Sequence, residues 1–324
     1  MSRIPRWLAP AALAPAAALD AAWALGINGP PAHVIAQTLA LPAHAAALAA
    51  LPAAALAPGR RARHLNAAAA LAVLGTGVGL LAGDWGGGSR PGDATLTVHS
   101  ANLEFERSDV SANVEEMLAA DCDVAVFQEV TPDYLRQLRA GLEGCYTEVV
   151  STSRDDALGA AMFARVEVRN ATIESAAGSP TPSADVVAGD GTVVRVLGVH
   201  TTPPIHGVGP WTAQHDRLAA MAREADRVVV AGDFNASGRH QPMRQLVAGG
   251  HLRDAHREVG QGLGLTWPAR LPIARLDRVL FRGLEPLSLS VGRAAGSDHR
   301  PVTARFSTAG RRVSAVVEKV RERA

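Results

Sequence analysis

Cysteine is scarce in this chain, which has 324 residues and 2 cysteines, Cys122 and Cys145. Two cysteines are too few for a disulfide-stapled scaffold, and this pair lacks the clustering of a structural zinc site. The first starts a predicted strand and the second follows the helix that returns from the far end of that strand. The sequence leaves open whether they form one disulfide or stay as separate thiols.

Charge and aromatic residues are also sparse. Charged residues make up 19% and hydrophobic residues 48%, which argues against a disordered or fibrous protein. The net charge is +1, and the part from residue 84 onward holds 27 basic and 30 acidic residues. A broad basic surface for tight nucleic-acid binding is therefore not expected, and no insertion rich in arginine and aromatics is present to clamp a duplex.

Long polar stretches are missing from the first 83 residues. Three apolar stretches cover about 7–26, 34–57 and 65–83, each near the roughly 20 residues that a membrane-spanning helix needs. Asp20 interrupts the first, where a carboxylate costs about 2.5–3.5 kcal/mol near the helix centre. We expect a membrane anchor of about three helices over 1–83. A cleaved signal peptide followed by an alanine-rich linker is the alternative, but it explains only one stretch.

Arginine is concentrated at two places in this region, before the first and before the third apolar stretch. Short cytoplasmic segments collect arginine and lysine, so both clusters are expected on the cytoplasmic side. The third helix then carries the chain across the membrane, so residues 84 onward are expected outside the cytoplasm. The sequence thus predicts a multi-pass protein of the cell membrane. The arginines are Arg3, Arg6, Arg60, Arg61 and Arg63.

The composition changes after residue 83. Residues 84–93 are rich in glycine and polar residues and predict a flexible linker. Residues 94–307 alternate short β-branched runs with helical periodicity, which predicts an α/β domain with a mixed sandwich of strands and helices. Residues 178–192 read as a short turn-rich stretch, and residues 308–324 as a basic, solvated tail. The expected strands cover 95–102, 124–127, 159–164, 166–173, 193–200, 227–232, 276–281 and 301–306, and helices cover 110–120, 211–224 and 241–248, with another opening at Thr131.

Acidic, amide and imidazole side chains recur where the predicted strands end. Strand ends on one edge of an α/β sheet converge, so these side chains can share a hard cation, and oxygen ligands without cysteine suit Mg²⁺ or Mn²⁺. Each has an ordinary explanation by itself, such as a turn residue or a buried histidine. Their order along the chain makes a shared site the better interpretation.

That order resembles the endonuclease/exonuclease/phosphatase superfamily over about residues 94–306. The resemblance implies a four-layer sandwich of two mixed β-sheets flanked by helices, and metal-dependent cleavage of phosphoester bonds. The matching segments are Ser100-Ala101-Asn102, Val126-Phe127-Gln128-Glu129, Gly198-Val199-His200, Gly232-Asp233-Phe234-Asn235, Leu276-Asp277-Arg278-Val279 and Ser297-Asp298-His299-Arg300-Pro301.

The resemblance also implies a role for each of these residues. Glu129 would be the main metal ligand, with Asn102 and Asp298 nearby and Glu104 as a further candidate. Cleavage of a phosphoester needs neutralised phosphoryl oxygens, an oriented water and a protonated leaving group.

The remaining residues of the resemblance would act on water and phosphate. Asp233 and Asn235 would orient the water and hold the phosphate, and His200 would donate a hydrogen bond to it. His299 would be the imidazole at the reacting phosphate, with Asp277 setting its tautomer. Whether Asp233 or His299 takes the proton from water stays open.

The substrate is not encoded in these motifs. A nucleic acid and a phospholipid headgroup both remain candidate substrates, no protein partner is identifiable, and a non-catalytic binding module of the same fold is the rival outside the enzymes. Trp211 and Trp267 are expected either to pack in the core or to line the site. Most of the remaining histidines are expected to face solvent, namely His206, His215, His240, His251 and His256.

Overall fold

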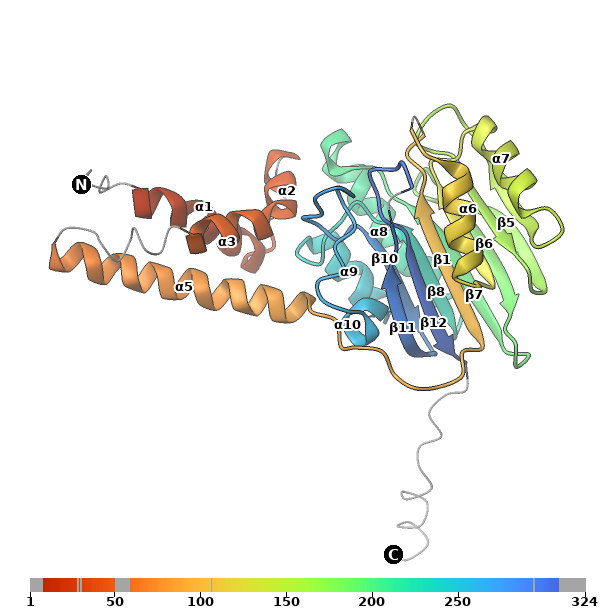
Figure 1. Ribbon diagram of the computed structural model, residues 1–324. Coiled ribbons are helices and arrows are strands. Elements are labelled where there is room, and N and C mark those ends of the chain that lie inside the picture. The colour runs from red at the N-terminus through yellow and green to blue at the C-terminus, as the bar shows by residue number, and fades with distance from the viewer. Residues whose placement is uncertain are drawn as a thin grey trace, which may run out of the picture.

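Two β-sheets lie face to face in the computed structural model, with helices on their outer faces and a separate group of N-terminal helices to one side (Figure 1). The structure describes residues 8–27, 29, 31–49, 59–105, 107–293 and 295–308. The first sheet is mixed, because β1 and β2 are parallel and the other pairs antiparallel. Its spatial order is β11 (Glu285–Val291), β12 (Val302–Ser307), β1 (Leu96–Asn102), β2 (Val124–Gln128), β4 (Ala160–Ala164) and β3 (Thr147–Thr152).

The second sheet is mixed in the same way, with β7 and β8 as its parallel pair. Parallel pairing places the carboxyl end of β1 beside that of β2, and the carboxyl end of β7 beside that of β8. Polar residues lie at these ends. The spatial order of this sheet is β5 (Val168–Ala176), β6 (Ser179–Val187), β7 (Val193–His200), β8 (Val228–Asp233), β10 (Asp277–Arg282) and β9 (Arg253–Asp254).

Three apolar layers hold the sandwich together. Valines of both sheets, such as Val126 and Val229, fill the space between the sheets. A second cluster lies between the first sheet and helices α6 (Val110–Ala119) and α7 (Pro132–Leu142), and a third between the second sheet and α8 (Val208–Arg223) and α9 (Gln241–Gly249). Full burial of each Val, Leu or Phe contributes about 1.5–3 kcal/mol. The predicted sandwich of two mixed sheets with helices is confirmed.

The helix starts follow local sequence. Asp109 accepts from the Ala112 backbone N–H to begin α6, and Thr131 accepts from the Tyr134 N–H to begin α7, with Pro132 in its first turn. Such caps contribute about 1 kcal/mol each. The predicted helix opening at Thr131 is confirmed.

Strand β6 corrects the expectation that residues 178–192 form a short turn-rich stretch. It is an interior strand between β5 and β7. Pro180 and Pro182 lie within it, and proline is normally confined to edges because it lacks an N–H donor. The pairing with β7 begins at Ser183, after both prolines, so neither interrupts that ladder.

The N-terminal helices pack against one another and touch the sandwich. They are α1 (Leu8–Ala24), α2 (Pro31–Thr38), α3 (Ala40–Ala49) and α5 (Arg60–Asp84). Asp20 of α1, expected to lie inside a membrane span, pairs with His44 of α3 at 2.9 Å from carboxylate to Nε2. The His240 ring Nε2 lies 2.9 Å from the Val34 carbonyl oxygen and ties α2 to the sandwich.

The three expected membrane-spanning helices are not found. Among the described residues, no helix is both long enough and apolar enough to cross a membrane. Helix α1 has 17 residues, fewer than the roughly 20 that a span needs. The second expected stretch is divided between α2 and α3, and its residues 50–57 lie outside the described part. Helix α5 is rich in the small residues alanine and glycine and includes Arg60 and Asp84 at its ends.

The segment after α5 differs from the flexible linker that its composition predicts. The N–H groups of Gly86 and Gly88 donate to the carbonyl oxygens of Gly262 and Gly260 at 2.8 and 2.9 Å. A Cβ at Gly86 would lie 2.3 Å from the Gly260 backbone, so glycine permits this close pairing. Arg90 adds an ion pair to Glu285 at 2.7 Å. The segment is thus held along the surface of the α/β domain.

The structure also decides the placement of several single residues. Cys122 is buried and Cys145 exposed, and both are free. Trp211 is fully buried, as the packing alternative predicts. The expectation of solvent-facing histidines is wrong for His215, His240 and His256, which are buried, and burial lowers the pKa of each to about 4. The predicted basic tail lies outside the described residues after Thr308.

Candidate active site

Strands of both sheets deliver polar side chains to one edge of the sandwich. Asn102 is the last residue of β1, and Glu129 follows the end of β2, its parallel neighbour. In the second sheet, Asp233 at the end of β8 is paired in register with His200 on one side and with Asp277 on the other. Strand register therefore brings together residues that lie far apart in the sequence.

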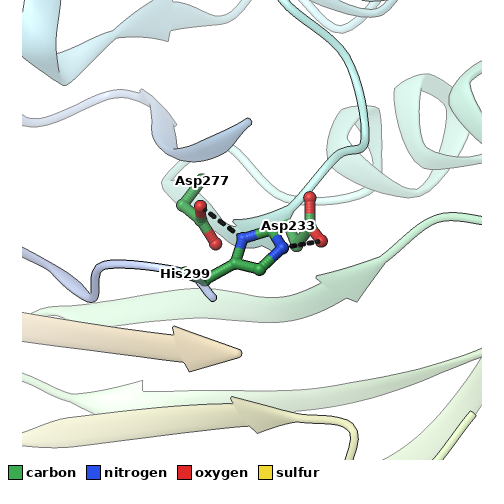
Figure 2. A group of neighbouring side chains, drawn as sticks. All are labelled: Asp233, Asp277 and His299. Carbon is green, nitrogen blue, oxygen red and sulfur yellow. Dashed lines mark hydrogen bonds and ion pairs between the residues drawn. The ribbon is translucent and has the colours of Figure 1, made fainter. Parts of the chain in front are cut away.

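His299 lies between two carboxylates of this edge (Figure 2). Its Nδ1 is 2.8 Å from Asp277 Oδ2, and its Nε2 is 3.6 Å from Asp233 Oδ2. All three residues are at most 7% exposed. Because a carboxylate can only accept, Nδ1 carries a proton and donates it to Asp277. The predicted pairing of His299 with Asp277 is present in this geometry.

The charge of the His299 ring is set by two opposing effects. Burial lowers the pKa of an imidazole because it disfavours the charged form. The carboxylates of Asp277 and Asp233 outweigh burial and raise the pKa of His299 to about 10. The ring is therefore cationic at neutral pH in the protein without bound metal.

Asn102 connects the two sheets at the site. Its Nδ2 donates to Glu129 Oε1 at 2.9 Å and to Asp233 Oδ2 at 3.1 Å. The other Glu129 oxygen accepts from the Phe105 backbone N–H at 3.2 Å. Glu129 has a φ of 59°, a left-handed conformation that turns the chain sharply after β2. The Glu129 carboxylate is thus fixed beside Asp233.

His200 approaches the same two carboxylates as Asn102. Its Nδ1 is 2.8 Å from the Ala157 carbonyl oxygen, which can only accept, so Nδ1 carries the proton. Its Nε2 lies 3.6 Å from Glu129 Oε1 and 3.7 Å from Asp233 Oδ2. The ring therefore presents Nε2 to Glu129 and to Asp233, and Asp233 also faces His299.

The chain around Asp233 is shaped to hold Asn235. The Asn235 N–H donates to Asp233 Oδ1 at 2.8 Å, and its Nδ2 donates to the Thr201 carbonyl at 2.7 Å. Asn235 has a φ of 45°, which asparagine tolerates better than most residues. On the other side, a Cβ at Gly232 would lie 1.9 Å from the Val199 carbonyl oxygen. Only glycine fits there. The backbone therefore explains both the first and the last residue type of the Gly-Asp-Phe-Asn segment.

A second pair of carboxylates borders the site. The Asp298 backbone N–H donates to Glu104 Oε2 at 2.9 Å, and the Trp267 indole N–H donates to Asp298 Oδ2 at 2.9 Å. Burial raises the pKa of Glu104, and the negative charges of Asp298 and Glu129 raise it further. Of the two tryptophans considered in the sequence, Trp267 is the one that contacts a site residue.

The donor set fits a hard divalent cation. Ligand atoms of Asp233, Asp277 and His299 lie within 4.8 Å of one another, a group that could hold a metal ion. Asp277 Oδ1 is buried without a hydrogen-bond partner among the described residues. The His299 Nδ1 is already bonded to Asp277, so the trio is better suited to proton transfer than to ligation. The nearby carboxylates of Glu129, Glu104 and Asp298 supply oxygen ligands of the kind that Mg²⁺ and Mn²⁺ prefer.

Every predicted site residue takes part in this connected group, and further residues support it. Ser297 Oγ donates to the Asn102 carbonyl at 2.8 Å and accepts from the His299 N–H at 3.0 Å. Thr266 Oγ1 accepts from the Asp277 N–H at 3.2 Å. Ser297 lies inside a segment that resembles the family, whereas no side-chain pattern signals the Ala157 carbonyl that orients His200.

Comparison with known proteins agrees with this geometry. Residues 99–299, more than half of the chain, match the Endonuclease/Exonuclease/phosphatase family. No curated protein matches the chain.

Solved structures share the fold over about two thirds of the chain. Humanized D. rerio TDP2 has a TM-score of 0.56 and 19% identity, covering 66% of this chain and 99% of that one. The mannosyl-6-phosphatase of Bacteroides thetaiotaomicron has a TM-score of 0.56 and 17% identity, covering 65% and 99%. The 3′ phosphatase NExo from Neisseria, bound to a product DNA hairpin, has a TM-score of 0.52 and 18% identity, covering 65% and 99%. At these identities the similarity shows the fold alone.

Proposed function

This chain belongs to the endonuclease/exonuclease/phosphatase family and is a hydrolase of phosphoester bonds, and from that premise we propose that it cleaves a phosphodiester with the help of Mg²⁺ or Mn²⁺. The observation that carries the proposal is His299, held between Asp277 and Asp233 at 2.8 and 3.6 Å. A buried imidazole with one nitrogen fixed by a carboxylate presents the other nitrogen to a reacting group.

The residues of the chain divide the work by their positions. Asp277 holds the His299 ring, so that Nε2 faces Asp233 and the space where the phosphate would lie. Asp233 takes the proton of the attacking water, or His299 does so in its neutral form, and Asn235 orients Asp233 through its backbone N–H. His200 would contact a phosphate oxygen through Nε2, the ring nitrogen that faces Glu129 and Asp233.

The metal ligands we propose are Glu129, Asn102, Asp298 and Glu104. A bound divalent cation neutralises charge on the phosphoryl oxygens and polarises the bond to be cleaved. The supporting observation is that Asn102 Nδ2 donates to Glu129 Oε1 at 2.9 Å and to Asp233 Oδ2 at 3.1 Å, so two carboxylates lie close together at this edge. Glu104 and Asp298 are joined to each other through a backbone N–H.

Nucleic acid is the first substrate class to test. Two solved structures with this fold contain DNA product, the Neisseria 3′ phosphatase and D. rerio TDP2, which gives DNA priority as a probe. A phospholipid headgroup is the second class, favoured by exposed apolar side chains on segments that flank the site. Ile205, five residues after His200, is 59% exposed, and Leu271, four residues after Trp267, is 76% exposed.

The deciding experiment is product release by the full chain. DNA, RNA, sphingomyelin, phosphoinositides and bis(p-nitrophenyl) phosphate are incubated with Mg²⁺ or Mn²⁺, and Asp233→Ala serves as the blank. Asp226→Ala is the matched control, because Asp226 is an exposed carboxylate just before the other end of β8. Turnover of one substrate class that vanishes only in the blank would support the proposal. A folded chain that cleaves none of these probes would favour a non-catalytic binding role.

Removal of divalent metal is expected to reduce this turnover to the level of the blank. Without the cation, the carboxylates around Glu129 repel an anionic phosphate instead of sharing a counter-charge with it. The measurement is the rate in EDTA, followed by titration with Mg²⁺ or Mn²⁺ to restore it. A rate unaffected by exhaustive chelation would contradict the assignment of Glu129 and its neighbours as metal ligands.

The location of the domain is a separate proposal: it lies outside the cytoplasm at the cell membrane. Its support is the arginine distribution of residues 1–83 alone, because no described helix is long and apolar enough to span a membrane. Cys145 is exposed and free, while Cys122 is buried with a pKa raised to about 12, so only Cys145 is expected to react readily with a maleimide. A membrane-impermeant maleimide added to intact cells should label this protein, and the Cys145→Ser variant should not be labelled. Labelling only after lysis would contradict this location.

A further inference from the structure

A cavity of about 770 Å³ lies between the end of α5 and the second sheet, where α9, β9 and α10 (Ala255–Val259) meet. It is separate from the active site, because Asp277 and Arg278 are neighbours on β10 and adjacent side chains of a strand point to opposite faces. Asp277 reaches His299, whereas Arg278 Nη1 pairs with Asp254 Oδ2 at 2.6 Å on the side of this cavity.

Arginine dominates the charged residues that line the cavity. The three carboxylates there are Asp84, Asp254 and Glu258, so arginines exceed carboxylates by three. This surplus contrasts with the domain as a whole, which is slightly acidic. The arginines are Arg239, Arg244, Arg253, Arg257, Arg275 and Arg278.

Two of these arginines are buried with incomplete hydrogen bonding. Arg275 is 5% exposed and Arg239 is 8% exposed. Both share the Asp84 carboxylate, at 3.5 and 3.1 Å. Nε of each, and Nη1 of Arg275, have no hydrogen-bond partner among the described residues. Burial lowers the pKa of both, that of Arg275 to about 10, which shows that their positive charge is poorly compensated.

Helix α5 leaves the cavity open. Gly79 and Gly83 line it, and a Cβ at Gly79 would have no atom within 4 Å. At Gly83 the nearest atom would be Arg257 Nη2 at 4.0 Å. The glycines therefore leave space in front of the arginines, and Asp84, the last residue of α5, is the α5 carboxylate that enters it.

We propose that this cavity binds a phosphate-bearing anion, supplied either as a soluble phosphate ester or as a lipid headgroup. Guanidinium groups match phosphate oxygens with paired hydrogen bonds, and an anion here would offset the surplus positive charge. The volume lies in the range of small-molecule sites and exceeds what phosphate alone would fill. Asp84 occupies part of this anion site with its own carboxylate.

The charge of the site is tested by calorimetric titration of the full chain with inorganic phosphate and with glycerol 3-phosphate. EDTA is present throughout, to suppress binding at the active site. Arg239→Gln and Arg257→Gln should each weaken binding about tenfold, the loss of one charge-assisted contact. Asp84→Asn should tighten it, because it removes a competing carboxylate. Arg136→Gln, at an exposed arginine of α7, is the matched control, and His299→Ala should leave the affinity unchanged.

The space is tested by Gly79→Leu, which fills the cavity without changing its charge. It should weaken glycerol 3-phosphate more than inorganic phosphate, whereas Gly75→Leu, one turn earlier and outside the cavity, should affect neither. Circular dichroism of each variant checks that the helices are retained.

The source of the anion is distinguished with vesicles of phosphatidylcholine alone or mixed equally with phosphatidylglycerol. If the wild type cosediments with the mixed vesicles and Arg239→Gln does not, the anion is a lipid headgroup. If the cavity variants weaken calorimetric binding but the wild type does not cosediment with the mixed vesicles, the anion is a soluble ester. The proposal is overturned if the wild-type chain binds none of these probes. Equal binding by the wild type and all cavity variants would overturn it as well.

Discussion

His299→Ala is expected to lower kcat by about 10³ to 10⁴-fold with little change in KM, since a positioned acid–base group contributes on this scale. The imidazole is held on both sides, by Asp277 at 2.8 Å and by Asp233 at 3.6 Å. The measurement is steady-state turnover, in saturating Mg²⁺, of the substrate that the product-release assay identifies.

The control for this variant is His251→Asn. His251 is exposed, and asparagine tolerates its φ of 51°. Asp277→Asn adds a sharper test, because an amide oxygen at the same position cannot stabilise the imidazolium as a carboxylate does, and the amide nitrogen can select the wrong tautomer. It should approach the His299→Ala rate with the ring still present. Wild-type rates in both variants would remove His299 from the reaction.

His299 should also leave a signature in stability that does not depend on turnover. Its folded pKa, about 10, lies above the ordinary value of about 6.5. The ring therefore adds stability that is fully present below about pH 6.5 and is lost as the pH rises through about 10. In EDTA, the free energy of unfolding of the wild type should fall over this window, and that of His299→Ala should fall less.

Asp233→Asn is expected to lower kcat by at least about 10³-fold, because the amide keeps the shape of the side chain but loses its charge and its basicity. Asp233 accepts hydrogen bonds from Asn102 Nδ2 and the Asn235 N–H and faces both imidazoles. It ends β8 of the second sheet and accepts from Asn102 at the end of β1, so it joins the two sheets at the site. The measurement is again kcat, with Asp226→Asn as the control and thermal unfolding as the check on folding.

The outcome for Asp233 also separates its two candidate roles. If Asp233 is the base, the Asp233→Asn enzyme should lose activity at every pH. If His299 is the base and Asp233 only orients water, a high concentration of an added small carboxylate should not restore the rate of a variant that lacks the Asp233 carboxylate. Rescue by acetate in a smaller variant, Asp233→Gly, would favour Asp233 as the base, whereas unchanged kcat in Asp233→Asn would exclude both roles.

Much of the site could be predicted because its residues follow strands with strong local patterns. The apolar runs before Glu129 and Asp233 specify buried strands, and the polar residue that ends each run must then lie at a sheet edge. The Gly-Asp-Phe-Asn segment carries its own backbone requirements at Gly232 and Asn235. Local sequence therefore contained both the strand and the turn that positions the carboxylate.

Other features were missed where distant contacts override local composition. Strand β6 contains two prolines and looks like a turn, yet its pairing with β5 and β7 makes it an interior strand. Glycines at 86 and 88 suggest flexibility, but they permit backbone pairing with Gly260 and Gly262. Glycine is common both in flexible linkers and where two backbones approach closely. Only the segment that packs against these glycines shows which of the two applies.

The sequence by itself determined the family, the α/β alternation and the residues of the candidate site, because each depends on short motifs and their order along the chain. Tertiary structure alone decided how these residues touch: which strands are neighbours, how His299 comes to lie between Asp277 and Asp233, and how the N-terminal helices pair Asp20 with His44. It also created the arginine-lined cavity, whose walls come from α5 and from residues more than 150 positions later. Contacts across such separations depend on packing of whole layers, which no local pattern specifies.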